Sequence, residues 1–180
     1  NLRIREVALP FLRQLMMGTN LTVHLAILEH YDAILIAKMD PPGVASLSTW
    51  IGRRMEVHCT GVGKALLATL PEGEREAFLH SRVFARHNDN TIISPRLLRQ
   101  QFEAVRKLGY SVDDEEDEVG FRCLGAPIPS VEGQYLNAAV SIAGTILTVN
   151  DSNRAELAAK LTRTAAQIGE AMQQEDSTRV

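Results

Sequence analysis

The segment from His58 to Ala68 reads HCTGVGKALLA and joins two glycines to a short apolar run typical of a helix. Glycines let the backbone turn tightly, and residues 64–70 have helical spacing. The first N–H groups of a helix lack partners within the helix, and the helix dipole favours an anion at the same place. The segment therefore predicts a binding site for a small anion, with a simple packing turn as the alternative.

Gly63 and Lys64 look like the end of a nucleotide-binding P-loop, but the rest of that motif is missing. A P-loop requires a glycine five residues before Gly63 and a serine or threonine after the lysine to hold Mg²⁺. His58 and Ala65 occupy those two positions. We therefore exclude a nucleoside triphosphate site.

Six consecutive acidic residues run from Asp113 to Glu118. Such a run is usually a solvated loop. It lacks the spacing of a calcium-binding loop and has no histidine near it in sequence, so we predict no metal site. Asp113 differs from its neighbours, because it directly follows a strand-like segment and its carboxylate can point into the fold.

Cys59 and Cys123 are the candidate nucleophiles. A buried cysteine is normally a small apolar residue, and a nucleophilic one needs a partner base. His58 precedes Cys59, but neighbouring side chains in a strand point to opposite faces, which disfavours a dyad. A thiol enzyme that uses Cys123 with Asp113 nearby remains as an alternative function.

These residues must be positioned by a mixture of helices and hairpin-like strands. Apolar spacing predicts helices over residues 2–17, 64–70, 72–80, 95–108 and 153–174. It predicts strands over residues 21–28, 33–39, 44–51, 110–112, 123–128 and 136–142. Successive hairpins with segregated helices favour an α+β domain built on an antiparallel sheet.

Composition narrows the class of protein. A chain of 180 residues with 45% hydrophobic residues suits a single domain. A net charge of −3 argues against nucleic-acid binding by this segment. We expect neither a membrane span nor a signal peptide, and two cysteines indicate a reducing, cytoplasmic setting. The sequence starts at Asn1 inside a helical pattern, so we expect it to be part of a longer protein.

Four segments follow one another in a fixed order along nearly the whole chain. They are HCTGVGKALLA at 58–68, GYSVDDEE at 109–116, GFRC at 120–123 with Ala126-Pro127-Ile128, and AAVSIAG at 138–144. Together they resemble the effector-binding domain of the IclR (isocitrate lyase regulator) family of bacterial transcription factors. The resemblance implies a GAF-like domain over residues 1–176, with a sheet of about six strands, flanking helices, long terminal helices and a short tail at 177–180.

The resemblance also implies a function. Members of the family are non-enzymatic sensors that bind small organic acids, such as 2-oxo acids or sugar-acid catabolites, without a cofactor. They form homodimers or homotetramers, and a preceding winged helix-turn-helix domain, absent from this sequence, binds operator DNA. The expected partners are therefore an organic-acid effector, further copies of the chain and, through the missing domain, DNA.

Matching the motifs residue by residue places an effector pocket. Gly61 and Val62 match the positions whose N–H groups hold the effector carboxylate. The polar positions of the pocket are Asp113, Cys123 and Ser141, and the apolar wall is Val44, Leu47, Met55 and Phe121. An apolar pocket with a few converging polar groups is what a small ligand requires.

Three positions depart from the family pattern. Ala143 replaces a frequent second pocket serine, and Thr145 replaces a frequent proline. The loss of one hydroxyl removes one potential hydrogen-bond partner of the ligand. The alternatives are a wider pocket, weaker binding of acids or a different effector. Glu56 stands where a proline is common, and we expect it to face solvent. An oligomerisation module with an unused pocket is therefore a further alternative.

Overall fold

The computed structural model describes residues 2–44, 47–130 and 137–177, and side chains up to residue 175. The helices are α1 (Leu2–Thr19), α2 (Gly61–Thr69), α3 (Glu72–Ser81), α4 (Pro95–Leu108) and α5 (Arg154–Ser177). The strands are β1 (Thr22–Glu29), β2 (Asp32–Met39), β3 (Arg54–Glu56), β4 (Ser111–Asp114), β5 (Phe121–Pro127) and β6 (Ala138–Thr145). The α+β prediction is confirmed.

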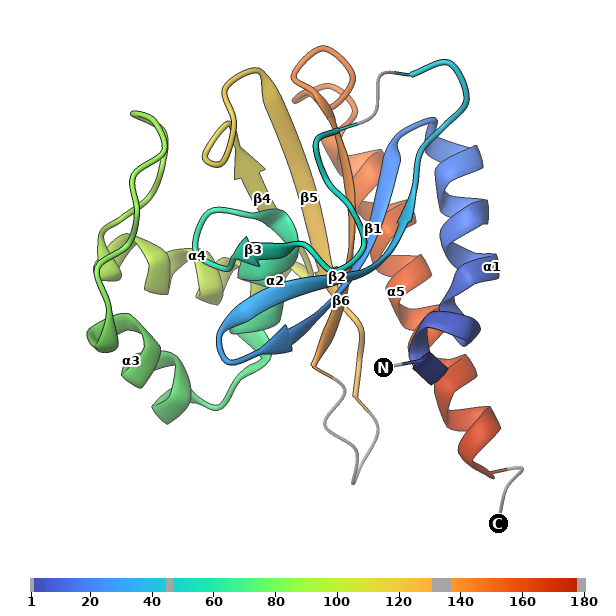
Figure 1. Ribbon diagram of the computed structural model, residues 1–180, viewed down its shortest axis with the longest axis horizontal. Coiled ribbons are helices and arrows are strands. Elements are labelled where there is room, and N and C mark those ends of the chain that lie inside the picture. Colours follow the sequence, from blue (N-terminus) through green and yellow to red (C-terminus); the bar gives the residue numbers. More distant parts are fainter. Residues whose placement is uncertain (1, 45–46, 131–136, 178–180) are drawn as a thin grey trace.

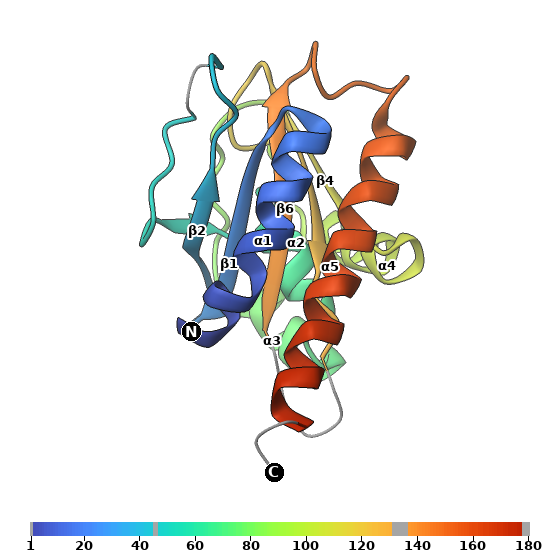
Figure 2. The same ribbon diagram turned by 90° about the vertical axis from the view of Figure 1, so that its right-hand side faces the viewer.

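The strands form one antiparallel sheet in the order β3-β2-β1-β6-β5-β4 (Figure 1). Helices α1 and α5 lie side by side on one face of the sheet, while α2, α3 and α4 lie on the other (Figures 1 and 2). Each face therefore has its own hydrophobic core, because a sheet covered on both sides buries both sets of its alternating side chains. None of the helices in the described ranges is long and apolar enough to cross a membrane.

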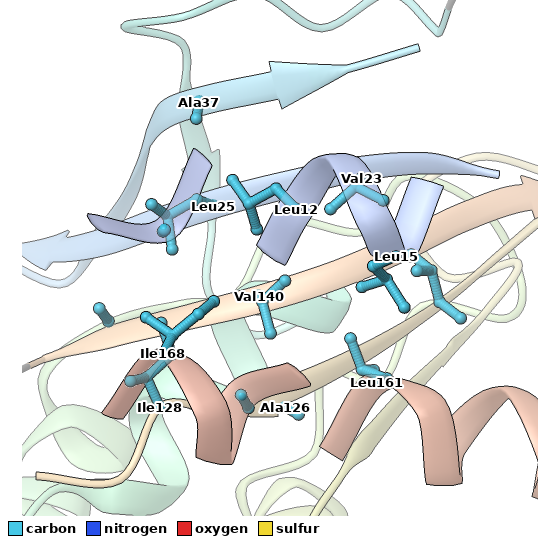
Figure 3. Packing of buried hydrophobic residues seen from close by; sticks show 14 of the residues in the cluster. Leu12, Leu15, Val23, Leu25, Ala37, Ala126, Ile128, Val140, Leu161 and Ile168 are labelled. Carbon is cyan, nitrogen blue, oxygen red and sulfur yellow. The ribbon is translucent and has the colours of Figure 1, made fainter. Parts of the chain in front are cut away.

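The core behind the sheet joins the two long terminal helices. Leu12 and Leu15 from α1 meet Leu25 from β1 and Val140 from β6, and Leu161 enters from α5 (Figure 3). All five side chains are at most 4% exposed. Each fully buried leucine contributes about 1.5–3 kcal/mol of burial free energy, so this core holds α1 and α5 firmly on the sheet.

The prediction of a strand over residues 44–51 is wrong. Residues 44 and 47–51 form bends, turns and irregular chain, and the third strand is the short β3 at 54–56. The apolar residues of this segment do not make a sheet ladder; instead its backbone carbonyls accept hydrogen bonds from a strand side chain. Lys38 Nζ donates to Leu47 O at 2.8 Å and to Thr49 O at 3.0 Å.

Most other boundaries agree with the sequence to within a few residues, and the prediction of 95–108 coincides with α4. Helix α2 begins at Gly61, three residues earlier than predicted, because both glycines lie in its first turn. The predicted start of the last strand, Leu136, and residues 178–180 of the predicted tail lie outside the described residues.

Candidate ligand-binding site

Two rows of cross-strand neighbours cross the sheet beneath helix α2. One row is His24, Ser141, Gly125 and Ser111, and the other is Ala143, Cys123 and Asp113. The members of the two rows are two positions apart along each shared strand, so all of them face the same side of the sheet. Four strands, β1, β6, β5 and β4, thus bring polar side chains to one place.

A cavity lies over these rows, with about 570 Å³ of space unfilled by protein atoms, including its mouth. Its lining residues are His24, Leu47, Ser48, Thr49, Arg53, Met55, Thr60, Gly61, Val62, Asp113, Asp117, Glu118, Phe121, Cys123, Ser141 and Ala143. Eight of the nine residues chosen from the sequence are therefore brought together. The ninth, Val44, is 48% exposed and is not among the lining residues.

The N-terminus of α2 opens into this cavity. Thr60 caps the helix: its Oγ1 accepts from Gly63 N at 3.2 Å and its backbone O accepts from Lys64 N at 3.0 Å. The amides of Gly61 and Val62 precede the first possible acceptor within the helix, so they are the two donors offered to a ligand. The helix dipole adds a positive potential at the same point.

Close contact with the sheet fixes the position of this helix end. Ser111 Oγ donates to Gly61 O at 2.6 Å. A Cβ on Gly125 would lie 2.2 Å from Gly61 O, so only glycine at this position lets the helix approach β5 so closely. The sequence motif therefore needs a partner glycine on another strand, which periodicity alone does not reveal.

Asp113 is buried, with 4% of its surface exposed. Burial raises the pKa of its carboxyl to about 7, against the lowering effects of the hydrogen bond from Glu116 N and of the charge on Lys64. Asp113 Oδ1 accepts from Glu116 N at 2.8 Å, which shapes the start of the acidic loop. Around neutral pH, Asp113 can therefore donate or accept a hydrogen bond at the cavity wall.

The expectation of a solvated loop over residues 113–118 holds only in part. Asp114 and Glu118 are exposed, whereas Asp113 and Glu116 are buried. Glu116 forms an ion pair with Lys64, which is itself completely buried on α2. Lys64, which made the motif look like a P-loop, is therefore one half of a buried ion pair. A single lysine in an otherwise apolar helix was the feature of the sequence that could have indicated this pair.

The segment from Leu47 to Arg53 supplies part of the cavity lining. His24 Nε2 lies 2.8 Å from Thr49 Oγ1, and Arg53 is hydrogen-bonded to Ser48 O. Burial, with a further contribution from Lys38, lowers the pKa of His24 to about 4, so this ring is neutral at physiological pH. Sequence reasoning missed His24, Thr49 and Arg53. His24 is a single polar residue within a strand, Thr49 lies where a strand was predicted, and Arg53 lies just after that segment.

The thiols of this domain are poorly suited to nucleophilic catalysis. Burial raises the pKa of Cys123 well above its usual value, and the nearby carboxylates of Asp113 and Asp117 raise it further. The pKa of Cys59 is raised for the same reasons, with burial as the largest cause. Since the thiolate is the nucleophilic form, neither environment supports a thiol enzyme.

Residues 1–170 match the family model for the C-terminal domain of the bacterial transcriptional regulator IclR. The Escherichia coli transcriptional repressor IclR is 35% identical over 161 residues, covering 88% of this chain and 58% of that protein. The E. coli regulator RhmR is 33% identical, covering 92% of this chain and 63% of its own length. The chain therefore spans about three fifths of these curated relatives.

Solved structures agree in fold. The Thermotoga maritima IclR structure has a TM-score of 0.88 and 32% identity, covering 93% of this chain and 67% of that chain. An IclR homolog from Microbacterium hydrocarbonoxydans, complexed with 4-hydroxybenzoate, has a TM-score of 0.85 and 25% identity, covering 96% and 69%. With the family model matching nearly the whole chain, this protein belongs to the IclR family of bacterial transcriptional regulators.

Proposed function

We propose that this domain senses a small organic acid, such as a 2-oxo acid or a sugar-acid catabolite, and thereby modulates operator binding by a longer regulator. The observation that carries the proposal is the free N-terminus of α2, whose Gly61 and Val62 amides face a cavity lined by eight of the predicted pocket residues. The relative in complex with 4-hydroxybenzoate supports a carboxylate ligand.

The charges of the cavity favour an acid that also carries hydroxyl or carbonyl groups. Within the lining, the helix end and Arg53 supply positive charge, while Asp117 and Glu118 supply hydrogen-bond acceptors. A carboxylate at the Gly61 and Val62 amides leaves the rest of the ligand facing Asp113, Cys123 and Ser141. Hydroxyl groups satisfy such acceptors, whereas a purely apolar tail leaves them without partners.

Thermal unfolding against pairs of matched ligands tests this proposal. Small carboxylates, including pyruvate, glyoxylate, aldonic acids and 2-oxo-3-deoxy sugar acids, are compared with their neutral amides and with neutral sugars. A ligand at a hundred times its Kd stabilises the domain by about 2.7 kcal/mol. For this chain length, that corresponds to roughly 5–10 °C. We expect the shift with one chemical group of acids and none with the amides.

Ser141→Ala is the matched test of the pocket, with Ser130→Ala as its control, because Ser141 lines the cavity and Ser130 is exposed. We expect the first variant to weaken binding of the responding acid while the second leaves it unchanged. Equal affinity in both variants would remove Ser141 from the site. Assembly of the chain with no response to any acid would favour an oligomerisation module with an unused pocket.

Binding of the acid is expected to weaken as the pH rises through 7. The pKa of Asp113 is raised to about 7, so at lower pH its neutral carboxyl donates a hydrogen bond, and at higher pH its charge repels a carboxylate. For one linked proton, Kd rises by up to about tenfold per pH unit above 7. Calorimetry at pH 6 and pH 8 measures this, and Asp113→Asn should remove most of the pH dependence.

The raised pKa of Asp113 also makes the free energy of unfolding depend on pH. The folded-state pKa of Asp113 lies above its unfolded value of 3.8, so the folded state holds the proton more tightly. Its contribution is complete below pH 3.8 and is lost as the pH rises towards 7. Asp113→Asn should therefore raise the free energy of unfolding at pH 8 relative to the parent chain, whereas unchanged stability would place the carboxylate in contact with solvent.

We further propose that the full-length regulator contacts DNA through a winged helix-turn-helix domain that precedes these residues, and that it works as a cytoplasmic homodimer or homotetramer. An effector changes DNA affinity only by binding one state of the assembly more tightly than another. Gel-shift measurements on the full-length protein, with and without the responding acid, test this step. An unchanged operator affinity would contradict it.

A further inference from the structure

A second group of chemically capable residues lies beside the cavity and not in its lining. Glu56 at the end of β3, His58 and Cys59 in the turn that follows, and His87 in the loop after α3 place one ligand atom each within 4.8 Å of all the others. Residue spacing did not reveal this group, because His87 is 28 residues beyond Cys59. Only the folding of residues 82–94 back over the turn brings it there.

The distances are close to those of a compact ligand set. Glu56 Oε2 lies 2.6 Å from His87 Nε2, 3.7 Å from His58 Nδ1 and 3.8 Å from Cys59 Sγ. A tetrahedral ion with bonds of about 2.0–2.3 Å separates its ligand atoms by about 3.3–3.8 Å. The distances from Glu56 Oε2 to His58 Nδ1 and to Cys59 Sγ are therefore those that one tetrahedral ion spans without rearrangement of the backbone.

The hydrogen bond of His58 supplies an independent observation. Its Nε2 lies 2.9 Å from the backbone O of Ala85, and because a carbonyl only accepts, this nitrogen carries the proton. In the neutral ring, Nδ1 then presents its lone pair to Glu56 and Cys59. A second ring nitrogen held by a backbone carbonyl is the usual outer support of a metal-binding histidine.

We propose that Glu56, His58, Cys59 and His87 form a closed, four-ligand site for a divalent cation of the Zn²⁺ type. Two imidazoles, one thiolate and one carboxylate are ligands that zinc accepts, and their two negative charges balance the ion. On binding, the Cys59 thiol releases its proton to the solvent, and the neutral His87 ring carries its proton on Nδ1, so that Nε2 exchanges its hydrogen bond to Glu56 for a metal bond. The Glu56 oxygen that accepted this hydrogen bond binds the ion as well. Four protein ligands leave no open position, so the role is structural.

Access and location fit this role. Cys59 and His58 are buried, whereas the side chains of Glu56 and His87 are 45% and 36% exposed, which leaves a path for the ion from solvent. The site would tie the loop after α3 to the turn that leads into Thr60 and the start of α2. It does not depend on the proposed effector, because none of its four residues lines the cavity.

Metal titration of the 180-residue chain, after treatment with a chelator, tests the proposal. Calorimetry with Zn²⁺ should give one ion per chain, and Co²⁺ should produce the near-ultraviolet charge-transfer band of a cobalt–thiolate bond. Cys59→Ser should abolish that band, while Cys123→Ser, which alters the only other thiol, should keep it. A band that survives Cys59→Ser, or that is lost with Cys123→Ser, would overturn the assignment.

His87→Gln changes a partly exposed side chain, so it tests the metal site without altering the buried residues. It should weaken Zn²⁺ binding by about tenfold or more. His80→Gln is its control, because His80 is on the outer surface of α3 with a 71% exposed side chain and should leave the affinity unchanged. Equal affinities for the two variants, or no Zn²⁺ binding by the parent chain, would contradict the site.

Discussion

Replacing Lys64 by Met is expected to lower the free energy of unfolding by about 3–5 kcal/mol, the usual loss when one partner of a buried ion pair is removed. Lys64 is completely buried and its ammonium contacts Glu116, with a further hydrogen bond to Gln101 Oε1 at 3.2 Å. Without it, the carboxylate stays buried with no cation. Urea unfolding with a linear extrapolation measures the loss.

The loss of unfolding free energy comes from breaking the ion pair between Lys64 and Glu116 and not from the change in side-chain volume. Burial already raises the pKa of Glu116, and within the described part of the chain its Oε2 has no hydrogen-bond partner. The double variant Lys64→Met with Glu116→Leu removes both charges and should recover a large share of the stability. Lys107→Met on the exposed side of α4 is the control and should change stability by no more than about 0.5 kcal/mol. A comparably small loss in Lys64→Met would contradict the burial.

Gly125→Ala is expected to destabilise the domain by about 3 kcal/mol or more and to abolish effector binding. The added Cβ would lie 2.2 Å from Gly61 O, 2.4 Å from Gly61 C and 2.8 Å from Ser111 Oγ. Two of these atoms belong to the backbone, so the start of α2 must move away from β5. Thermal unfolding and calorimetry with the responding acid measure the two effects together.

Gly73→Ala provides the matched control for this substitution. A Cβ at Gly73 meets no atom within 4 Å, and the residue lies in helix α3. The substitution should raise stability by up to about 1 kcal/mol, because alanine loses less entropy than glycine in a helix. If Gly125→Ala behaved like Gly73→Ala, the close approach of helix and strand would be wrong.

The sequence predicts the elements whose patterns are local. Helix α4 shows its apolar face through Leu98, Phe102 and Val105, and Gly109 ends it with a φ of +84°. Segment 44–51 shows the opposite case, since its apolar residues mimic a strand. Its structure is decided by hydrogen bonds to the side chains of Lys38 in β2 and His24 in β1. These two strands already pair with each other. Pairing of distant segments leaves no trace in the periodicity of one of them.

The candidate site also has residues that the sequence predicts and residues that it does not. The motif at 58–68 indicated the helix end, and the resemblance indicated Asp113, Cys123 and Ser141 at positions that the strand register brings to one face. Within the segment from Leu47 to Arg53, only Leu47 was predicted to line the pocket. The rest of the segment was not predicted, because its place depends on side chains from β1 and β2. The burial of Glu116 escaped notice because five of its neighbours in the acidic run are equally charged, and only Lys64 distinguishes it.

The alternation of side chains along β1 joins the cavity to the core on the opposite face of the sheet. His24 faces the cavity and holds Thr49, while the adjacent Val23 and Leu25 pack in the core with α1 (Figure 3). No loop separates the residue that lines the cavity from the two residues that pack with α1, because they are immediate neighbours in the strand. Although the ligand site and the first helix lie on opposite faces of the sheet, His24 of the site is one residue away in sequence from Val23 and Leu25, which pack with that helix.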